Sequence, residues 1–171
     1  MLSPPTGRTG SSFIAVAAGT YHSMALRNNG TLHCCGDDSY GQSPSRANGP
    51  YVAIAAGHTH SLALGSDGTV KEWGGAIKYK PPGVKRRPPT IHSNGPFVAI
   101  AAGNAHSLAL RENGTVVCWG MNDVGQAPPE GEVPQGQFVA IAAGPGHSLA
   151  MRADGTVVRW GAPYIEDPSE E

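Results

Sequence analysis

The sequence predicts an all-β fold, a β-propeller or partial propeller of four small antiparallel blades with three to four strands each. A 24-residue pattern occurs four times, starting at residues 13, 51, 97 and 138, without internal insertion or deletion. Each copy contains three runs of strand length, and an Asn-Gly or Asp-Gly pair separates the last two runs. Self-similarity at a spacing of about 40 residues is typical of propellers and other repeat architectures.

The third copy, FVAIAAGNAHSLALRENGTVVCWG, shows the expected elements in order. Its first run, residues 97–102, ends before a glycine that is expected to break the strand where backbones crowd. The second run, residues 106–111, alternates so that its histidine and two leucines share one face. The third run is expected over residues 115–119. Between these two runs, Asn113-Gly114 predicts a two-residue type I′ turn, in which both residues have positive φ.

Both faces of such a sheet are partly apolar, so a single sheet would expose one apolar side to water. Stacking the sheets around an axis buries these faces, and radial stacking suits small sheets better than a two-layer sandwich. The small Ala-Ala-Gly segment fits the crowded inner part of a ring. Three copies end in a tryptophan that is expected to pack between blades: Trp73, Trp119 and Trp160.

The recurring pattern carries a family signature. It reads apolar-x-x-V/I-A-A-G-x-x-H-S-L-A-L, then D/N-G-T-V, then W-G. This pattern resembles the regulator of chromosome condensation repeat, and the resemblance covers residues 13–161. Asp123, Gly125 and Gln126 also match the usual continuation of that repeat. Because the repeats are short, the chain is similar to the short-repeat branch, which includes a propeller-type β-lactamase inhibitory protein with three-stranded blades.

The resemblance implies fold more directly than function, because the activities of one fold lie in its loops. Members of the family exchange nucleotide on a small GTPase, bind chromatin, inhibit enzymes, sense ultraviolet light or hold partner proteins. The light-sensing branch has tryptophans around the G-x-x-H segment, where none of these copies has one. We therefore expect a non-catalytic protein–protein interaction scaffold, as a structural or accessory subunit of a larger assembly. The alternatives are a guanine-nucleotide exchange factor or chromatin-binding regulator, and a protein inhibitor of a hydrolase.

The sequence predicts no catalytic set, cofactor or metal site. His22, His60, His106 and His147 each precede a serine. Adjacent strand residues point to opposite faces, so such a pair is poorly placed to act as nucleophile and base. Recurrence in every copy indicates a scaffold role, with each imidazole bonding backbone between blades. Equivalent residues of a ring also lie too far apart for zinc, whose ligands lie about 2.0–2.1 Å from the metal.

Charge and cysteine content limit the cellular setting and the partners. The net charge of −1 gives no general attraction to nucleic acid or anionic membranes, and no apolar run has the length of a membrane span. The apolar run after Arg8 coincides with the first strand, so we interpret it as a strand and not as a signal peptide. Three cysteines without a Cys-x-x-Cys pair favour an intracellular setting, cytoplasmic or nuclear, with an organellar assembly left open.

The chain divides into an extended leader over residues 1–12, the four-repeat domain over 13–161 and an acidic tail over 162–171. The longest connector, after the second copy, alternates cations with prolines. We expect either a solvated extended loop or a binding loop for an acidic protein surface, with phosphate or nucleic-acid contact as a third alternative. The cations are Lys78, Lys80, Lys85, Arg86 and Arg87.

Four copies raise the question of how the ring closes, because propellers have about 4–8 blades and those of the resembled family about seven. An open arc exposes an apolar blade face at each end, which soluble monomers rarely tolerate. The ring can be a compact four-bladed one, or two chains can close it by two-fold symmetry. Another protein can cover the ends, or the chain can be part of a longer one. We favour an arc completed by a second copy or by a partner.

Overall fold

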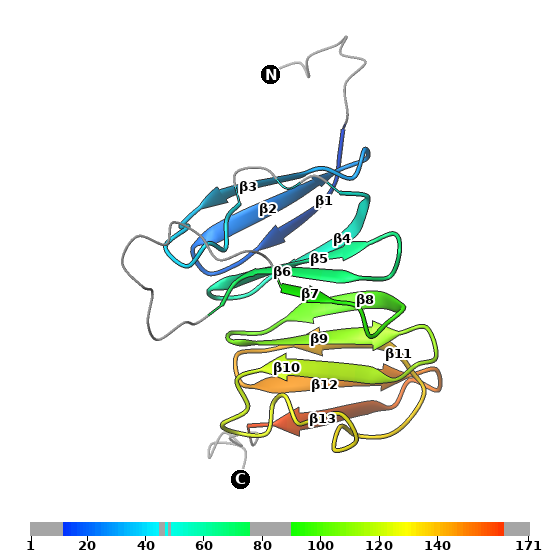
Figure 1. Cartoon of the computed structure of the whole chain (residues 1–171). Helices are drawn as coiled ribbons and strands as arrows, with labels where there is room; N and C mark the ends of the chain where they lie inside the picture. Colours follow the sequence, from blue (N-terminus) through cyan, green and yellow to red (C-terminus); the bar gives the residue numbers. More distant parts are fainter. Residues whose placement is uncertain (1–11, 45–46, 48, 76–89, 163–171) are drawn as a thin grey trace, which may run out of the picture.

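The structure, a computed structural model, describes residues 12–44, 47, 49–75 and 90–162. In this part of the chain, four antiparallel sheets follow one another, and each contains one copy of the repeated pattern. We call these sheets blades 1 to 4. Figure 1 shows them stacked in chain order, with blade 1 at the top and blade 4 at the bottom. The sequence prediction of an all-β fold with four small antiparallel blades is confirmed.

The strands lie close to their predicted positions. Blade 1 contains β1 (Phe13–Ala18), β2 (His22–Arg27) and β3 (Leu32–Gly36). Blade 2 contains β4 (Tyr51–Ala56), β5 (His60–Gly65), β6 (Val70–Gly74) and β7 (Thr90–His92). Blade 3 contains β8 (Phe97–Ala102), β9 (His106–Arg111) and β10 (Val116–Gly120). Blade 4 contains β11 (Phe138–Ala143), β12 (His147–Arg152) and β13 (Val157–Gly161). The third strand of blade 3 therefore begins and ends one residue later than expected.

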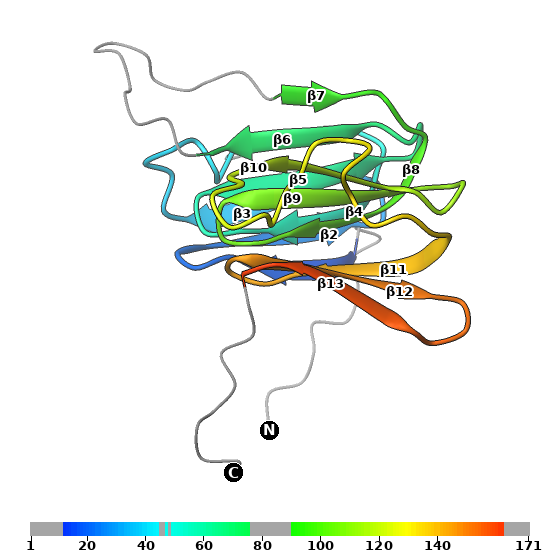
Figure 2. The same ribbon diagram turned by 90° about the horizontal axis from the view of Figure 1, so that it is seen from below.

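The blades are arranged around an axis that runs beside their first strands. Successive first strands contact one another, β1 with β4, β4 with β8, and β8 with β11. Figure 2, seen from below, shows the sheets one behind another with β11–β13 in front. Blades 1 and 4 lie at opposite ends of the stack in Figure 1, so the arc is open.

Each blade has two faces of different chemistry. The face that we call the His face carries the histidine and the two larger apolar side chains of the second strand. The opposite face, which we call the Ser face, carries the serine and the alanine that alternate with those residues along the same strand. The His face of each blade packs on the Ser face of the next, and one apolar cluster fills each of the three junctions. At the junction of blades 2 and 3, for example, Leu64 belongs to the same cluster as Phe97 and Ala109.

The hairpin turn differs from the predicted type I′ turn. In the described part of the chain only glycines have positive φ, so the prediction that both turn residues have positive φ is wrong. In blade 1 the Gly30 N–H donates to Arg27 O at 2.9 Å, and Gly30 has φ 79°. This is a type I turn followed by a glycine bulge. Asn29 Oδ1 accepts hydrogen bonds from the Thr31 N–H and hydroxyl, which explains the Asn or Asp before each glycine.

Two features were not predicted from the sequence. The register shifts after the first residue of each first strand, and this bulge leaves the following side chain on the surface, as at Val98. The segment interpreted as a connector after blade 2 contains a fourth strand, β7, which pairs with β6. The five cations of the predicted binding loop lie outside the described residues, as do nearly all of the leader and the tail. Nothing helical in the described residues has the length and apolarity to cross a bilayer.

Candidate functional site

The repeated histidines lie at the blade junctions, and three of them contact the serine of the next blade. The Nε2–Oγ distances are 2.7 Å for His22 and Ser61, 3.0 Å for His60 and Ser107, and 3.0 Å for His106 and Ser148. The expected backbone partner is thus replaced at Nε2 by a serine hydroxyl. A histidine and the serine that follows it in sequence point into different junctions, as the alternation of a strand requires.

In two of these pairs, the directions of the hydrogen bonds fit a structural contact and not a catalytic one. Ser61 Oγ donates to Gln42 O at 2.7 Å, and Ser148 Oγ donates to Gln126 O at 2.8 Å. A hydroxyl whose proton is given to a carbonyl accepts a hydrogen bond from the imidazole N–H. In the pairs His22–Ser61 and His106–Ser148 the imidazole is then a donor and not a base toward the serine, so this geometry does not activate a nucleophile.

Burial lowers the pKa of the three inner histidines, because a charged imidazole loses hydration at the junction. For His22, the nearby carboxylates of Asp37 and Asp38 offset part of this effect. These imidazoles are therefore neutral near pH 7. Among the described residues no blade follows His147, which is only half-buried.

The three tryptophans occupy equivalent positions on the Ser faces. Trp73 packs edge-to-face on Tyr51, with ring centres 5.9 Å apart. Trp160 Nε1 donates to Gln126 O at 3.2 Å. Trp73 also belongs to the cluster that contains Met24 and Leu26 of blade 1. The predicted role of the tryptophans in packing between blades stays a prediction, which this cluster favours. Blade 1 has Cys35 at this position, and its side chain is exposed.

Glu72 is the centre of a polar cluster between blades 2 and 3. Its Oε2 accepts hydrogen bonds from Trp119 Nε1 at 2.8 Å and from His92 Nε2 at 3.0 Å. Burial by itself raises the pKa of Glu72, but the hydrogen bonds from His92 and Trp119 outweigh burial and leave that pKa below its ordinary value. The His92 ring also stacks on Trp119 with ring centres 4.2 Å apart. The unpredicted strand β7 is thus joined to the neighbouring blade.

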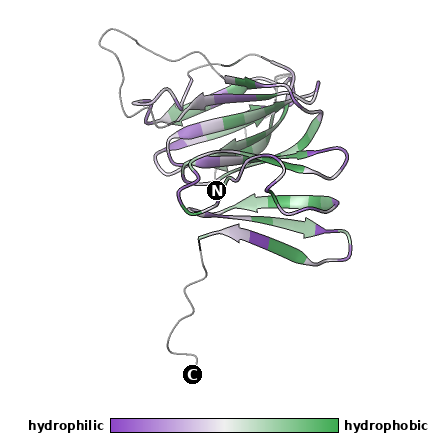
Figure 3. Cartoon of the chain, turned by 60° about the horizontal axis from the view of Figure 1, so that its bottom comes forward, coloured by the Kyte–Doolittle hydropathy of each residue, from purple (hydrophilic) through white to green (hydrophobic). Residues whose placement is uncertain are grey.

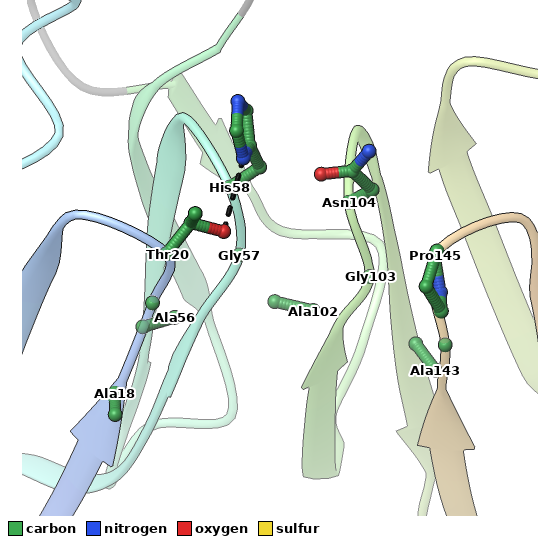
Figure 4. A pocket seen from close by; sticks show the side chains of 12 residues that line it. Ala18, Thr20, Ala56, Gly57, His58, Ala102, Gly103, Asn104, Ala143 and Pro145 are labelled. Atoms are coloured by element: carbon green, nitrogen blue, oxygen red, sulfur yellow. Dashed lines mark hydrogen bonds between the residues drawn. The ribbon is translucent and has the colours of Figure 1, made fainter.

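An axial groove of about 340 Å³ lies where the four blades converge (Figure 4). Each blade contributes the last alanine of its first strand, the glycine that follows and one further residue. The lining residues are Ala18, Gly19 and Thr20; Ala56, Gly57 and His58; Ala102, Gly103 and Asn104; and Ala143, Gly144 and Pro145. A β-carbon at Gly57 would lie 2.5 Å from Gly103 O, so the blades approach one another more closely than any side chain allows.

The last lining residue of each blade is where the repeats differ. Thr20, His58, Asn104 and Pro145 follow an invariant Ala-Ala-Gly, and Figure 4 shows them together at one mouth of the groove. His58 Nδ1 lies 3.0 Å from Thr20 Oγ1. The sequence analysis used these positions only to judge light sensing and missed them as a site. The available signal was their variation inside an otherwise repeated segment.

Tyr21 extends this mouth on the side of blade 1. Its ring meets the His58 ring edge-to-face at 5.5 Å, and 65% of its surface is exposed. An aromatic residue that is held by a neighbour and still faces solvent is well suited to bind a partner. Among the described residues, no group of three or more His, Cys, Asp or Glu is placed to hold a metal ion.

The two ends of the stack lack a neighbouring blade. The Ser face of blade 1 exposes Phe13 by 53% and Val16 by 80%. The His face of blade 4 exposes Met151 by 38% and Val157 by 59%. We call these two surfaces the end faces. Figure 3 shows hydrophobic stretches, in green, along the strands of the sheet at the bottom of the view.

Comparison with known proteins explains the repeat. The family model for the regulator of chromosome condensation (RCC1) repeat matches residues 13–42 and 97–126, which include all the strands of blades 1 and 3. Blades 1 and 3 therefore match the RCC1 repeat. None of the curated proteins matches it in sequence. The predicted short-repeat branch stays a prediction.

Solved structures share the arrangement of the blades. Human WBSCR16 is 20% identical with a TM-score of 0.75, over 95% of this chain and 52% of that protein. Prp20p from Saccharomyces cerevisiae is 21% identical with a TM-score of 0.73, over 91% and 47%. The computationally designed Ika4 protein is 19% identical with a TM-score of 0.53, over 92% and 95%. These likenesses show the propeller fold, and the chain spans about half the length of WBSCR16 and Prp20p.

Proposed function

We propose that the chain is a non-catalytic module, a subunit of a larger assembly, that binds a segment of another protein at the mouth of the axial groove. One observation carries the proposal: four nearly identical blades present four different side chains around one opening. Residues that recur in every copy build the frame of a repeat protein, and residues that differ give a surface its own chemistry.

The chemistry of the mouth fits a protein segment. Tyr21 offers an exposed aromatic ring, and tyrosine is enriched among the residues that dominate binding energy in interfaces. His58 and Asn104 add polar groups, while alanine and glycine form the floor. A floor without large side chains leaves room for a protruding loop or chain end of the partner. The spacing of the blades is fixed by backbone contact, so this surface is rigid before binding.

The solved relatives support protein binding in general and suggest a second candidate function. The structure report on Prp20p names its binding to Gsp1p and histones, and another structure shows yeast RCC1 (Prp20) bound to Kap60. For this chain, action on a small GTPase or on chromatin is the second candidate. This candidate predicts that the chain speeds nucleotide release from a small GTPase. If the chain accelerated release from none of the GTPases in a panel, this candidate would be excluded. Inhibition of a hydrolase stays a prediction from the sequence.

Affinity capture from the native source with a paired variant tests the first candidate. The double variant Tyr21→Ala/His58→Ala removes the aromatic ring and the imidazole at the mouth. Tyr40→Ala is the matched control, because Tyr40 is 47% exposed on a loop away from the groove lining. We expect a protein held by the wild type and by the control to be lost from the double variant. Calorimetry with that protein should show a loss of affinity of about tenfold or more. Equal binding by all three chains would overturn the proposal.

A further inference from the structure

We infer that two copies of the chain join head to tail, with the His face of blade 4 of each copy on the Ser face of blade 1 of the other. Two such junctions close one ring. This surface is distinct from the mouth of the axial groove. The inference therefore goes beyond the proposed function, and either can fail while the other stands.

The three junctions inside the chain follow one rule. Each has the His–Ser contact between second strands at 2.7–3.0 Å. Each also has a backbone hydrogen bond from the first strand of one blade to the turn glycine of the blade before it. These bonds join the Tyr51 N–H to Gly30 O at 3.4 Å, the Phe97 N–H to Gly68 O at 2.9 Å, and the Phe138 N–H to Gly114 O at 2.9 Å. A fourth junction of the same kind needs one His face and one Ser face.

The end faces carry the two halves of this rule. Blade 4 presents His147 and the turn glycine Gly155, and blade 1 presents Ser23 and Phe13. The turn glycines of blades 1, 2 and 3 are crowded by the following blade, whereas no atom of the described residues lies within 4 Å of a β-carbon placed at Gly155. In the joined pair His147 contacts Ser23 of the second copy, and Gly155 O accepts the N–H of its Phe13.

The sizes of the side chains also match across the proposed junction. Inside the chain, the tryptophan of a Ser face lies opposite a smaller residue of the preceding His face. Trp119 Nε1 donates a hydrogen bond to Glu72, and Trp160 packs in one cluster with Cys118. On the end faces this order is reversed, because blade 1 has Cys35 and blade 4 has Arg159 at the corresponding positions. A large residue again meets a small one, as close packing requires.

The extent of the chain and of its end faces fits two copies. The chain spans 52% of WBSCR16 and 47% of Prp20p, so two copies supply about one whole propeller of that size. A three-stranded sheet with strands of five or six residues measures roughly 18 by 14 Å. Four such faces bury on the order of 1,000 Å², which reaches the lower range of specific interfaces. A head-to-tail contact of this kind forms a closed ring when its rotation closes after two copies.

Light scattering after size exclusion measures the mass of the 171-residue chain in solution. We expect twice the 17.6 kDa of one chain at tens of micromolar protein. Val16→Asp and Val157→Asp each place a carboxylate on one end face, at side chains that are 80% and 59% exposed in the single chain. Both variants should be folded monomers. Val98→Asp is the matched control, because Val98 is 52% exposed on the surface bulge of blade 3, and this variant should remain a dimer.

The pattern of results identifies the contact. If the dimer formed between two equal faces, only one of the two end-face variants would dissociate it, and the head-to-tail contact would be excluded. A wild-type monomer, or an open series of larger oligomers, would overturn the closed two-copy ring. Ser23→Ala and His147→Ala test the register, since each removes one hydrogen bond from both junctions. Each should raise the dimer Kd about a hundredfold, roughly tenfold per junction, and the double variant should be no weaker than either. If the two substitutions acted independently, so that their effects on the dimer Kd multiplied in the double variant, the His147–Ser23 contact would be excluded.

Discussion

Blades 1 and 3 are built on the same 24-residue pattern and pair their strands in the same register, yet they differ in what covers them. Phe97 is 3% exposed because the His face of blade 2 covers it, whereas the equivalent Phe13 is 53% exposed. Ser107 is buried and Ser23 is exposed. The comparison teaches that the repeat sequence determines the blade, and that the neighbouring blade determines which of its side chains form the core.

The largest expected effect is on stability. Phe97→Ala should lower the free energy of unfolding by about 3–5 kcal/mol, because it leaves a cavity between blades 2 and 3. Phe13→Ala should cost about 1 kcal/mol or less, since it removes only partly exposed contacts with His33 and Arg27. Both changes are made in the Val157→Asp background, which removes any second copy, and are measured by urea unfolding. Equal losses of unfolding free energy in the two variants would show that Phe13, on the Ser face of blade 1, is also covered in the single chain.

The pH dependence of stability sharpens the comparison at the inner junctions. Burial lowers the pKa of His22, His60 and His106 below the ordinary value of 6.5, so below that pH the unfolded chain binds more protons than the folded chain. Their contribution to stability is therefore complete above pH 6.5 and is lost as the pH falls toward their folded pKa values.

Thermal unfolding at pH 7.5, 6.5 and 5.5 measures this effect. We expect the melting temperature to fall across the series, and to fall less in His106→Gln, which keeps an N–H donor but does not titrate. All chains carry Val157→Asp, which removes any second copy. His33→Gln is the control, because His33 lies on the Ser face of blade 1, which is then uncovered. A steeper fall in His106→Gln than in the wild type would contradict the lowered pKa of His106.

The smallest effect is one of reactivity, without a change in stability. Burial raises the pKa of Cys118 to about 12 and that of Cys34 to about 11, so both thiols stay protonated. Cys35 is exposed on the end face of blade 1. In the Val157→Asp chain, which removes any second copy from the end face, Cys35 should react first with a maleimide reagent, as followed by mass spectrometry. Cys118 should react only as the chain unfolds. Labelling of Cys118 at the rate of Cys35 would show that the junction of blades 3 and 4 opens readily.

The sequence predicted the blades well because their determinants are local. Alternation of His106, Leu108 and Leu110 with smaller residues was sufficient to locate a strand and to assign its faces. The turn type was wrong because Asn-Gly suits both a type I′ turn and the residues before a glycine bulge, and only the φ of Asn113 separates the two. The bulge before Ala99 could not be recognised from the alternation of large and small residues, because it displaces only a single residue of the strand.

The site could be predicted only in part, because its contacts join distant residues. His22 and Ser61 are 39 residues apart, and His60 and Ser107 are 47 apart, so spacing alone gives no pairing. The strand β7 depends on the contacts of His92 with Glu72 and Trp119, which the connector sequence does not reveal. The groove was within reach, because its four differing residues stand at the first of two variable positions between a constant Ala-Ala-Gly and a constant histidine.

The contact between axial glycines has a consequence for how such proteins change in size. A β-carbon at Gly19 would meet Gly57 O, and one at Gly103 would meet Gly144 O, so at the axis neighbouring units touch through main-chain atoms. Main-chain atoms are the same in every unit, so this axial contact does not depend on which units meet. Duplication or loss of one 40-residue segment adds or removes a whole building block with both mating surfaces intact. Ring circumference in this architecture thus evolves in whole steps.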